Sequence, residues 1–461
     1  MKIDAAKDLL ETVFASSYSR DNFKRLAAEV FNRYDRKEQT IYEEGIKNFT
    51  NLGLFEDDKG KKIAIFEVEL LSENSLHRAR VKQRNLIANQ LKIHDYESAL
   101  CSFYHANQGE WRLSFITRES SIDVSSPKLN SIEQLSPSRR QSFIAGPNEG
   151  THTAKKQFLP RIQADNNPSF DEIASIFEIE AVNDDFYEQY KELYLRLTEE
   201  LEQFMEKDPV IAADFKEKEV SASDFAKKTL GQFVFLYFLQ RKGWIKDKEH
   251  PDEGFSFKKL FDDRKNFGEN FFNDLMEPIF YESLAKKEPN LDVYSVLRRY
   301  EFPYLNGGLF EPIRDYDWEK TNIVISDTFF KNDNRTKDGD HGDGLLDVFN
   351  RFNFTVHEND ALEQDIAVDP EMLGKVFEKL LPIKERKDSG SFYTPREIVQ
   401  YMCQESLINY LVTEIGDEIP SEILKLFITN HSILEAKDMK GTELEIVAEN
   451  AMALDKLLEN V

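Results

Sequence analysis

Apolar positions spaced three and four residues apart predict helices at the start of this chain. The runs KDLLETVF and NFKRLAAEVFNRYDRKEQTIYEEGIKNF keep this spacing over residues 1 to about 50. The spacing then changes to alternation, which is typical of strands. NLGLFED and KIAIFEVEL flank a DKGK turn, and SALCSFY and WRLSFITRES flank Asn107-Gln108-Gly109. These runs predict two β-hairpins.

The helical run SLHRARVKQRNLIANQLKI separates the two predicted hairpins. The order helix, strand, strand, helix, strand, strand predicts a small α/β domain over residues 1–120. Residues 121–170 are rich in Ser, Pro, Asn and Gly and carry no long periodic run. We therefore expect an extended connector there.

Residues 171–380 predict a mainly α-helical connector domain. Its run SASDFAKKTLGQFVFLYFLQRKGWI has Ser221 or Ser223 as a candidate N-cap and Gly243 at its end. An aromatic stripe in this run is predicted to be a buried helix face, namely Phe233, Phe235, Tyr237 and Phe238. A later helix, DPEMLGKVFEKLLP, is expected to start near Asp369. Together with a last segment over residues 381–461, the predicted fold class is α+β.

Composition places the protein among globular chains of several domains. Its 461 residues are more than a domain with one hydrophobic core usually has, and 40% of them are hydrophobic. The chain has no run near the roughly 20 apolar residues that cross a bilayer. Its two cysteines, Cys101 and Cys403, lie far apart, which argues against a disulfide framework. We expect a cytoplasmic protein in a reducing compartment, with no membrane partner.

The net charge of -25 opposes phosphate binding over the whole surface, since such binding needs Lys and Arg. One stretch differs, because residues 74–94 carry no acid at all. If the chain contacts double-stranded DNA, this stretch supplies the expected contact residues, which are Arg78, Arg80, Lys82, Gln83 and Arg84.

The first predicted hairpin carries the residue types of a metal-dependent nuclease. Such sites combine an Asp on one strand with an acid-x-Lys on the next, so that two carboxylates hold Mg²⁺ and the Lys orients or activates water. Asp57 ends the first strand, and Glu67 and Glu69 follow on one side of the second. Glu69 stands where the Lys is expected. We predict Asp57 and Glu67 as Mg²⁺ ligands and Asp57, Glu67 and Glu69 as candidate catalytic residues.

A non-catalytic interpretation of the same strand stays open. Glu67 lies inside an apolar run, where an unpartnered acid is costly, so it needs a cation or an arginine partner. In this alternative the acids of a half-exposed strand pair with Arg80 or Arg84.

A polar loop, NDNRTKDGDHGDG, gathers Asp338, Asp340, His341 and Asp343. The loop lacks the spacing and the terminal Glu of an EF-hand. We expect a solvated Asp/Gly turn there rather than a metal site.

The stretch GSFYTPREIVQYM near the end of the chain has the features of a ligand-binding corner. Gly390 allows close backbone approach, Thr394 before Pro395 favours an extended residue ahead of a helix, and Glu397 falls in the first helical turn. Phe392 and Tyr393 are placed to face a ligand.

This stretch resembles the first motif of amino-group adenine DNA methyltransferases, which holds part of S-adenosylmethionine. With FLYFLQRKGWI, PYLNGGLFEP, DPEMLGKVFEKLL, KIAIFEVEL and WRLSFI, the chain resembles the N-terminal portion of type IIG restriction enzymes. The resemblance implies a PD-(D/E)XK-like nuclease domain, a helical connector and the start of a methyltransferase domain. It also implies a set of cofactor-binding residues, which are Gly390, Phe392, Tyr393, Thr394, Pro395 and Glu397.

The family's Gly-rich cofactor loop and Asn-Pro-Pro-Tyr loop do not occur in this sequence, and there is no Pro-Pro pair. We therefore do not expect methylation by this chain alone. Two hypotheses remain. The first is the nuclease and connector part of a restriction-modification protein that acts in phage defence. The second is a non-catalytic DNA- or partner-binding subunit that pairs with a separate methyltransferase and target-recognition chain.

Overall fold

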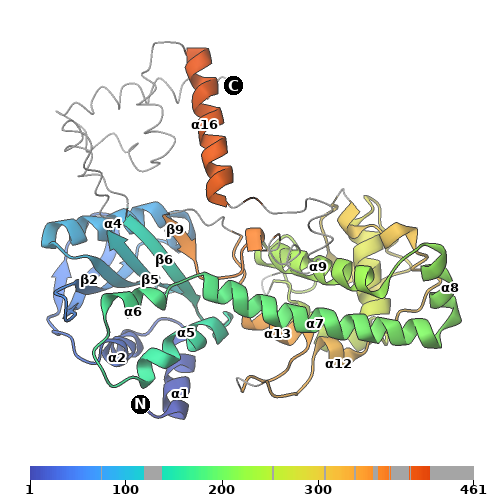
Figure 1. The fold of residues 1–461 in the computed structure, drawn as a ribbon, viewed down its shortest axis with the longest axis horizontal. Coiled ribbons are helices and arrows are strands. Elements are labelled where there is room, and N and C mark those ends of the chain that lie inside the picture. Colours follow the sequence, from blue (N-terminus) through green and yellow to red (C-terminus); the bar gives the residue numbers. More distant parts are fainter. Residues whose placement is uncertain are drawn as a thin grey trace.

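The protein is described by a computed structural model in which the chain forms two lobes (Figure 1). The structure describes residues 1–415 except 74, 119–137, 252–253, 306–307, 337–338, 357–361, 373, 375–393 and 395. One lobe is built on a sheet and the other mainly on helices, and α7 (Glu180–Lys207) runs from the first toward the second. The predicted α+β class is confirmed.

The first lobe contains a mixed sheet of seven strands in the order β1-β2-β3-β4-β5-β6-β9. The strands are β1 (Gln39–Ile41), β2 (Ile46–Glu56), β3 (Lys62–Leu70), β4 (Ser98–Tyr104), β5 (Trp111–Arg118), β6 (Ser138–Ala145) and β9 (Glu363–Asp365). The pairs β2/β3 and β4/β5 are antiparallel, which confirms both predicted hairpins. Strands β3 and β4 are parallel.

The helical run between the hairpins forms the crossover that a parallel pair requires. It divides at Ala79 into α3 (Ser75–Arg78) and α4 (Arg80–His94). Alternate side chains of β3, namely Ala64, Phe66, Val68 and Leu70, pack against Leu86, Ile87 and Leu91 of α4. This apolar contact holds the crossover on one face of the sheet.

Helices α1 (Ile3–Phe14), α2 (Arg20–Phe31) and α5 (His152–Gln163) cover the other face. Phe14 lies at the centre of this contact, with its ring centroid 6.2 Å from that of Trp111 and 5.4 Å from that of Phe158. The opposite side chains of β3, beginning with Ile63 and Ile65, belong to this core. Strand β3 is therefore covered on both faces.

Two sequence expectations about this lobe are wrong. The helical pattern assigned to residues 1 to about 50 ends at Phe31, and β1 and the start of β2 follow within it. The segment expected as an extended connector contains β6 and α5. Both elements contribute to the core, through Phe143 of β6 and Phe158 of α5, because pairing and packing with distant residues decide their structure.

The second lobe is assembled around α9 (Ala222–Arg241), whose limits match the predicted caps. The Ser221 side chain accepts a hydrogen bond from the Asp224 amide at 3.0 Å, and Gly243 has a left-handed φ of 66°. In the aromatic stripe, Phe233, Tyr237 and Phe238 are buried and Phe235 is half-buried against the core. The stripe is confirmed as core.

Short elements complete this lobe. They are α8 (Pro209–Glu217), β7 (Lys246–Asp247), α10 (Phe257–Asp262), η2 (Arg264–Asn266), the π-helices η3 (Phe271–Met276) and η4 (Pro278–Leu284), α11 (Ser295–Arg299), β8 (Tyr300–Glu301), η5 (Gly308–Phe310), η6 (Ile313–Asp315), α12 (Asp327–Phe330) and α13 (Leu345–Arg351). Helix α6 (Phe170–Ser175) lies in the sheet lobe instead, where the ring centroids of Phe170 and Phe115 of β5 are 6.0 Å apart. Of the predicted helix at DPEMLGKVFEKLLP, Pro370–Met372 are helical, and most of the rest lies outside the described residues. Among the described helices, none has the length and apolar character to cross a membrane.

The chain returns from the second lobe to the first as β9, which pairs in parallel with β6. Its Asp365 is fully buried and forms ion pairs with Arg112 and, at 3.2 Å, with Arg80. Burial alone would raise the pKa of Asp365, but Arg112 and Arg80 outweigh this effect and hold the pKa far below its ordinary value. An ion-pair network therefore fixes the returning strand to the sheet.

Replacing Asp365 with Asn should destabilise the protein by about 3–5 kcal/mol, because Arg112 would keep a buried charge without its partner. Asp95→Asn is the matched control, since Asp95 pairs with Arg118 at 3.2 Å while its side chain is 96% exposed. Urea unfolding would measure both variants. Equal small losses in the two variants would contradict this account of β9.

A charged contact joins α5 of the first lobe to α7 and to the loop before α13. The two ring nitrogens of His152 lie 2.7 Å from Asp185 and 2.9 Å from Asp340. Since carboxylates only accept hydrogen bonds, both nitrogens donate and the ring is an imidazolium. Burial alone would lower the pKa of His152, but the bonds to Asp185 and Asp340 outweigh it and raise the pKa.

This raised pKa sets the direction of a pH effect on stability. The contribution of His152 is fully present below the unfolded-state pKa of about 6.5 and is lost as the pH rises through the higher folded-state value. Wild-type protein should therefore exceed His152→Gln in urea midpoint at about pH 6, and this advantage should shrink as the pH rises above about 6.5. A pH-independent difference between the two proteins would show that the imidazolium does not contribute.

Candidate active site on strand β3

Glu67 and Glu69 lie on the face of β3 that is turned toward α1 and α2. They share this face because side chains alternate along a strand, and Phe66 and Val68 point toward α4. Glu67 is 5% exposed and Glu69 is 6% exposed. Two carboxylates buried so close together require compensation by nearby donors or cations.

Tyr18, between α1 and α2, and Arg20, the first residue of α2, compensate Glu67. The Tyr18 hydroxyl donates to Oε1 at 2.7 Å, and the Arg20 Nε lies 3.1 Å from Oε2. Ser102 donates to the Tyr18 oxygen at 3.1 Å, and the Tyr18 ring stacks on Tyr104 with centroids 3.9 Å apart. Burial, and then the charge of Glu67, raise the pKa of Tyr18 well above its ordinary value. The Tyr18 hydroxyl therefore keeps its proton and donates a hydrogen bond to the Glu67 carboxylate.

Residues of β2 compensate Glu69. The Lys47 ammonium lies 2.7 Å from Oε1, and the Asn48 amide donates to Oε2. Burial alone would raise the pKa of Glu69, but Lys47 and Asn48 outweigh burial and lower it. Glu69 is therefore a carboxylate at neutral pH. The expected pairing of the β3 acids with Arg80 or Arg84 is wrong, because Arg20 and Lys47 take that place.

Asp57 does not join this pair. It lies in the turn after β2, where Oδ1 accepts the amides of Lys59 and Lys61, each at 2.9 Å, and Oδ2 accepts the amide of Phe170 at 3.0 Å. Glu56 faces Lys62 and Thr50 faces Glu67 across the hairpin. At roughly 3.3 Å per residue, Glu67 is therefore about 16 Å further along the strand. A single ion shared by Asp57 and Glu67 does not fit this register.

The expected DNA-contact residues divide into two groups. Arg78 and Lys82 are exposed, at the end of α3 and in the first turn of α4. Arg80, Gln83 and Arg84 face the protein interior instead: Arg80 and Arg84 pair with Glu363, and Gln83 donates to the Ser75 carbonyl oxygen at 2.6 Å. Arg80, Gln83 and Arg84 therefore hold β9 and α3 in place, and DNA contact by the expected set stays a prediction.

Most of the predicted cofactor residues lie outside the described residues, namely Gly390, Phe392, Tyr393 and Pro395. Thr394 is exposed, and Glu397 falls in the first turn of α16 (Arg396–Ile415). The helix start predicted after Thr394-Pro395 is confirmed. Figure 1 shows α16 projecting away from the sheet lobe.

The acidic loop after α12 engages protein partners. Asp340 pairs with His152, as described above, and Asp343 lies 3.2 Å from Arg196 and accepts from Asn332 at 2.7 Å. Asp338 lies outside the described residues. Across the described part of the chain, no group of three or more His, Cys, Asp or Glu side chains is arranged to hold a metal ion.

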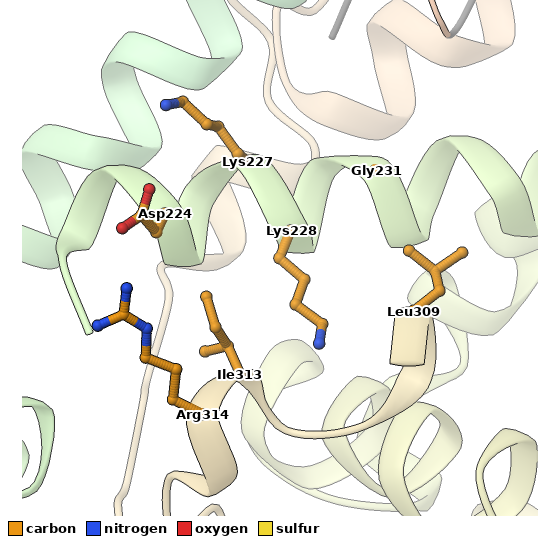
Figure 2. A pocket seen from close by; sticks show the side chains of 7 residues that line it. All are labelled: Asp224, Lys227, Lys228, Gly231, Leu309, Ile313 and Arg314. Carbon is orange, nitrogen blue, oxygen red and sulfur yellow. The ribbon is translucent and has the colours of Figure 1, made fainter. Parts of the chain in front are cut away.

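A separate pocket of about 420 Å³ lies in the second lobe between α9 and residues 308–314 (Figure 2). Lys228 extends from α9 into it and donates to the Gly308 carbonyl oxygen at 2.9 Å. Burial lowers the pKa of Lys228, while Glu311 and Asp315 act in the opposite direction. Three cations, Lys227, Lys228 and Arg314, line the pocket together with one acid, Asp224.

A divalent cation is compatible with the β3 pair, although not with the predicted ligand set. Mg²⁺ is commonly held by one or two carboxylates, with water and substrate phosphate completing its shell. Glu67 and Glu69 supply two hard oxygen ligands on one face. Their present cationic partners, Arg20 and Lys47, have side chains 43% and 50% exposed, so both can move into solvent. The fitting pair is Glu67 with Glu69, in place of Asp57 with Glu67.

A comparison with curated proteins finds a relative in Methanocaldococcus jannaschii named "Putative type II restriction enzyme and methyltransferase RM.MjaORFECS2P". The two sequences are 26% identical over 250 residues, which is 53% of this chain and 19% of the relative. The similarity supports a restriction-modification family. The chain spans less than two thirds of the relative's length, so the activities of that whole protein are not transferred here. No family model and no solved structure matches the chain.

Sequence reasoning missed the residues that surround the two glutamates. Lys47 and Asn48 stand in a run whose spacing predicted a helix, so the sequence did not predict that they lie on a strand beside β3. Tyr18 lies between α1 and α2 and Arg20 begins α2, and nothing in the local sequence marks them as partners of Glu67. The usable signal was the buried acid itself, which required a cation from elsewhere in the fold.

Replacing Asp57 with Ala should lower the free energy of unfolding by about 1–3 kcal/mol, because three backbone amides would lose a charged acceptor. The neighbouring Asp58 is exposed and provides the control Asp58→Ala, which should change stability little. Thermal and urea unfolding would compare the two. If Asp57→Ala were as stable as the control, the carboxylate would not be needed in the turn.

Proposed function

We propose that this chain is the N-terminal, nuclease-containing part of a restriction-modification enzyme, and that its sheet lobe hydrolyses DNA phosphodiesters. The observation that carries the proposal is the buried pair Glu67 and Glu69, whose cationic partners reach it from half-exposed positions. The similarity to a restriction-modification protein supports a DNA substrate.

In this proposal Glu67 and Glu69 hold a Mg²⁺ ion. A bound Mg²⁺ supplies positive charge to a phosphodiester and makes water more acidic. The Tyr18 hydroxyl keeps Glu67 in position through its hydrogen bond, and the stack on Tyr104 fixes Tyr18. Arg78 and Lys82 are exposed cations at α3 and α4 and are suited to contact DNA phosphates.

The stretch GSFYTPREIVQYM is proposed, on its resemblance alone, to form part of a S-adenosylmethionine site in a complete methyltransferase. The remaining parts of such a site would come from a methyltransferase and target-recognition region, which can be a separately encoded partner chain.

A second candidate function is supported by a specific observation. All four oxygens of Glu67 and Glu69 already have a protein partner in Tyr18, Arg20, Lys47 or Asn48. Two carboxylates neutralised by two cations form a stable arrangement without a metal. In this candidate the lobe binds DNA or a partner subunit and does not cleave.

Cleavage of unmethylated supercoiled plasmid in Mg²⁺ distinguishes the two candidates. We expect wild-type protein to cleave and Glu67→Gln and Glu69→Gln to lose at least about 100-fold in rate, because metal charge stabilisation is worth several kcal/mol. Glu11→Gln is the matched control, since Glu11 also pairs with a lysine, at 2.7 Å, but lies on α1 with its side chain 52% exposed.

Gel-shift measurement of DNA binding accompanies the cleavage assay. Retained DNA binding by the glutamine variants, together with their loss of cleavage, would support the nuclease. Wild-type protein that binds DNA without cleaving it would contradict the nuclease and favour the second candidate.

A further inference from the structure

Lys47 occupies an irregular position in β2. Ile46 faces Leu70 and Asn48 faces Glu69 across the hairpin, so Lys47 is an extra residue that has no partner in the register. This arrangement is a β-bulge. In a regular strand Lys47 and Asn48 would point to opposite faces. The bulge lets both side chains reach the same carboxylate, Glu69.

The bulge places a positive charge next to the Glu69 carboxylate. The Lys47 side chain is 50% exposed, whereas the Glu69 side chain that it contacts is 8% exposed. Its ammonium therefore reaches the buried Glu69 carboxylate from a half-exposed position at the protein surface. Bulges commonly redirect a side chain beside an active site.

We propose that Lys47 is a catalytic residue of the lobe and binds the scissile phosphate during DNA cleavage. The inference rests on the proposed nuclease function and adds a residue to it. Position 69, where an acid-x-Lys site has its lysine, holds a glutamate in this chain. The neighbouring strand supplies the ammonium instead, 2.7 Å from that glutamate.

The reaction assigned to this site is hydrolysis of one phosphodiester. A water oxygen forms a bond to phosphorus, and the bond from phosphorus to one deoxyribose oxygen breaks. The water loses a proton to solvent, and the departing oxygen takes up a proton from solvent. Lys47 stays protonated throughout and donates to a non-bridging oxygen, whose negative charge grows as the new bond forms.

The competing explanation is that Lys47 only neutralises Glu69. Both explanations agree that Lys47→Ala removes an ion pair from a half-exposed site, so stability alone does not separate them. They differ in the effect on the cleavage rate once the metal and the DNA are bound.

The test measures single-turnover plasmid cleavage by full-length wild type, Lys47→Ala, Lys47→Arg and Lys37→Ala. Lys37 is the matched control, because it pairs with Asp35 at 2.9 Å and is exposed. Calorimetric titration with Mn²⁺, DNA binding in Ca²⁺ and melting temperature are measured on the same proteins. We expect Lys47→Ala to cleave about 100-fold more slowly, as when one donor to a developing oxyanion is removed. We expect Lys47→Arg to recover part of the rate and Lys37→Ala to match wild type.

Mn²⁺ affinity should not fall in Lys47→Ala, because the ammonium competes with the metal ion for Glu69. Cleavage by Lys47→Ala at the wild-type rate would overturn the role of Lys47 and leave the nuclease proposal standing. Loss of Mn²⁺ binding in Lys47→Ala would also overturn it, since the lysine would then serve to position the carboxylate. Absence of cleavage by wild-type protein would overturn both the nuclease and this inference.

Discussion

The coverage of β3 on both faces is the constraint on which the sheet lobe depends. One face packs its apolar residues against α4, and the other packs Ile63 and Ile65 into the core shared with α1 and α2. A strand in this position cannot turn Glu67 and Glu69 toward bulk solvent. The fold therefore brings a donor or cation to each carboxylate, and all four partners lie outside β3: Tyr18 and Arg20 before and in α2, and Lys47 and Asn48 in β2. The candidate site is a consequence of this compensation.

The second constraint is the return of the chain to the sheet. Strand β9 follows the whole helical lobe in sequence and still completes the sheet beside β6. Its acids pair with Arg80, Arg84 and Arg112, so the acid-free stretch of the sequence serves in part to receive this strand. The two lobes are thus joined by paired charges as well as by covalent connection. The His152 contact with Asp185 and Asp340 adds a second charged contact between them.

Local patterns predicted the elements whose structure depends on neighbouring residues. Both hairpins, the crossover helix and the aromatic face of α9 follow from periodicity, turn residues and caps. The elements that were missed depend on distant residues. Strand β9 has three residues and forms only because β6 is beside it, and β6 itself was hidden in a polar segment. Sequence spacing also could not show that the Asp57 carboxylate accepts hydrogen bonds from backbone amides, since one of these amides belongs to Phe170 at the start of α6.

The same distinction applies within the candidate site. Alternation along β3 correctly placed Glu67 and Glu69 on one face, because that relation is local. The bulge at Lys47 breaks the alternation of side chains along β2, and no residue type in that strand predicts a bulge there. The sequence grouped Asp57 with Glu67, but Asp57 is held in its own turn. The candidate pair is therefore Glu67 and Glu69 on β3, with partners from β2 and from residues 18–20.

The most direct test of this account is the number of Mn²⁺ ions bound per chain, measured by electron paramagnetic resonance during titration. Wild type, Glu67→Gln, Glu69→Gln and Asp57→Ala would be compared under identical conditions. The account predicts one bound ion in wild type and in Asp57→Ala, and loss of that ion in both glutamine variants. Binding that survives in Glu67→Gln and Glu69→Gln but disappears in Asp57→Ala would contradict it.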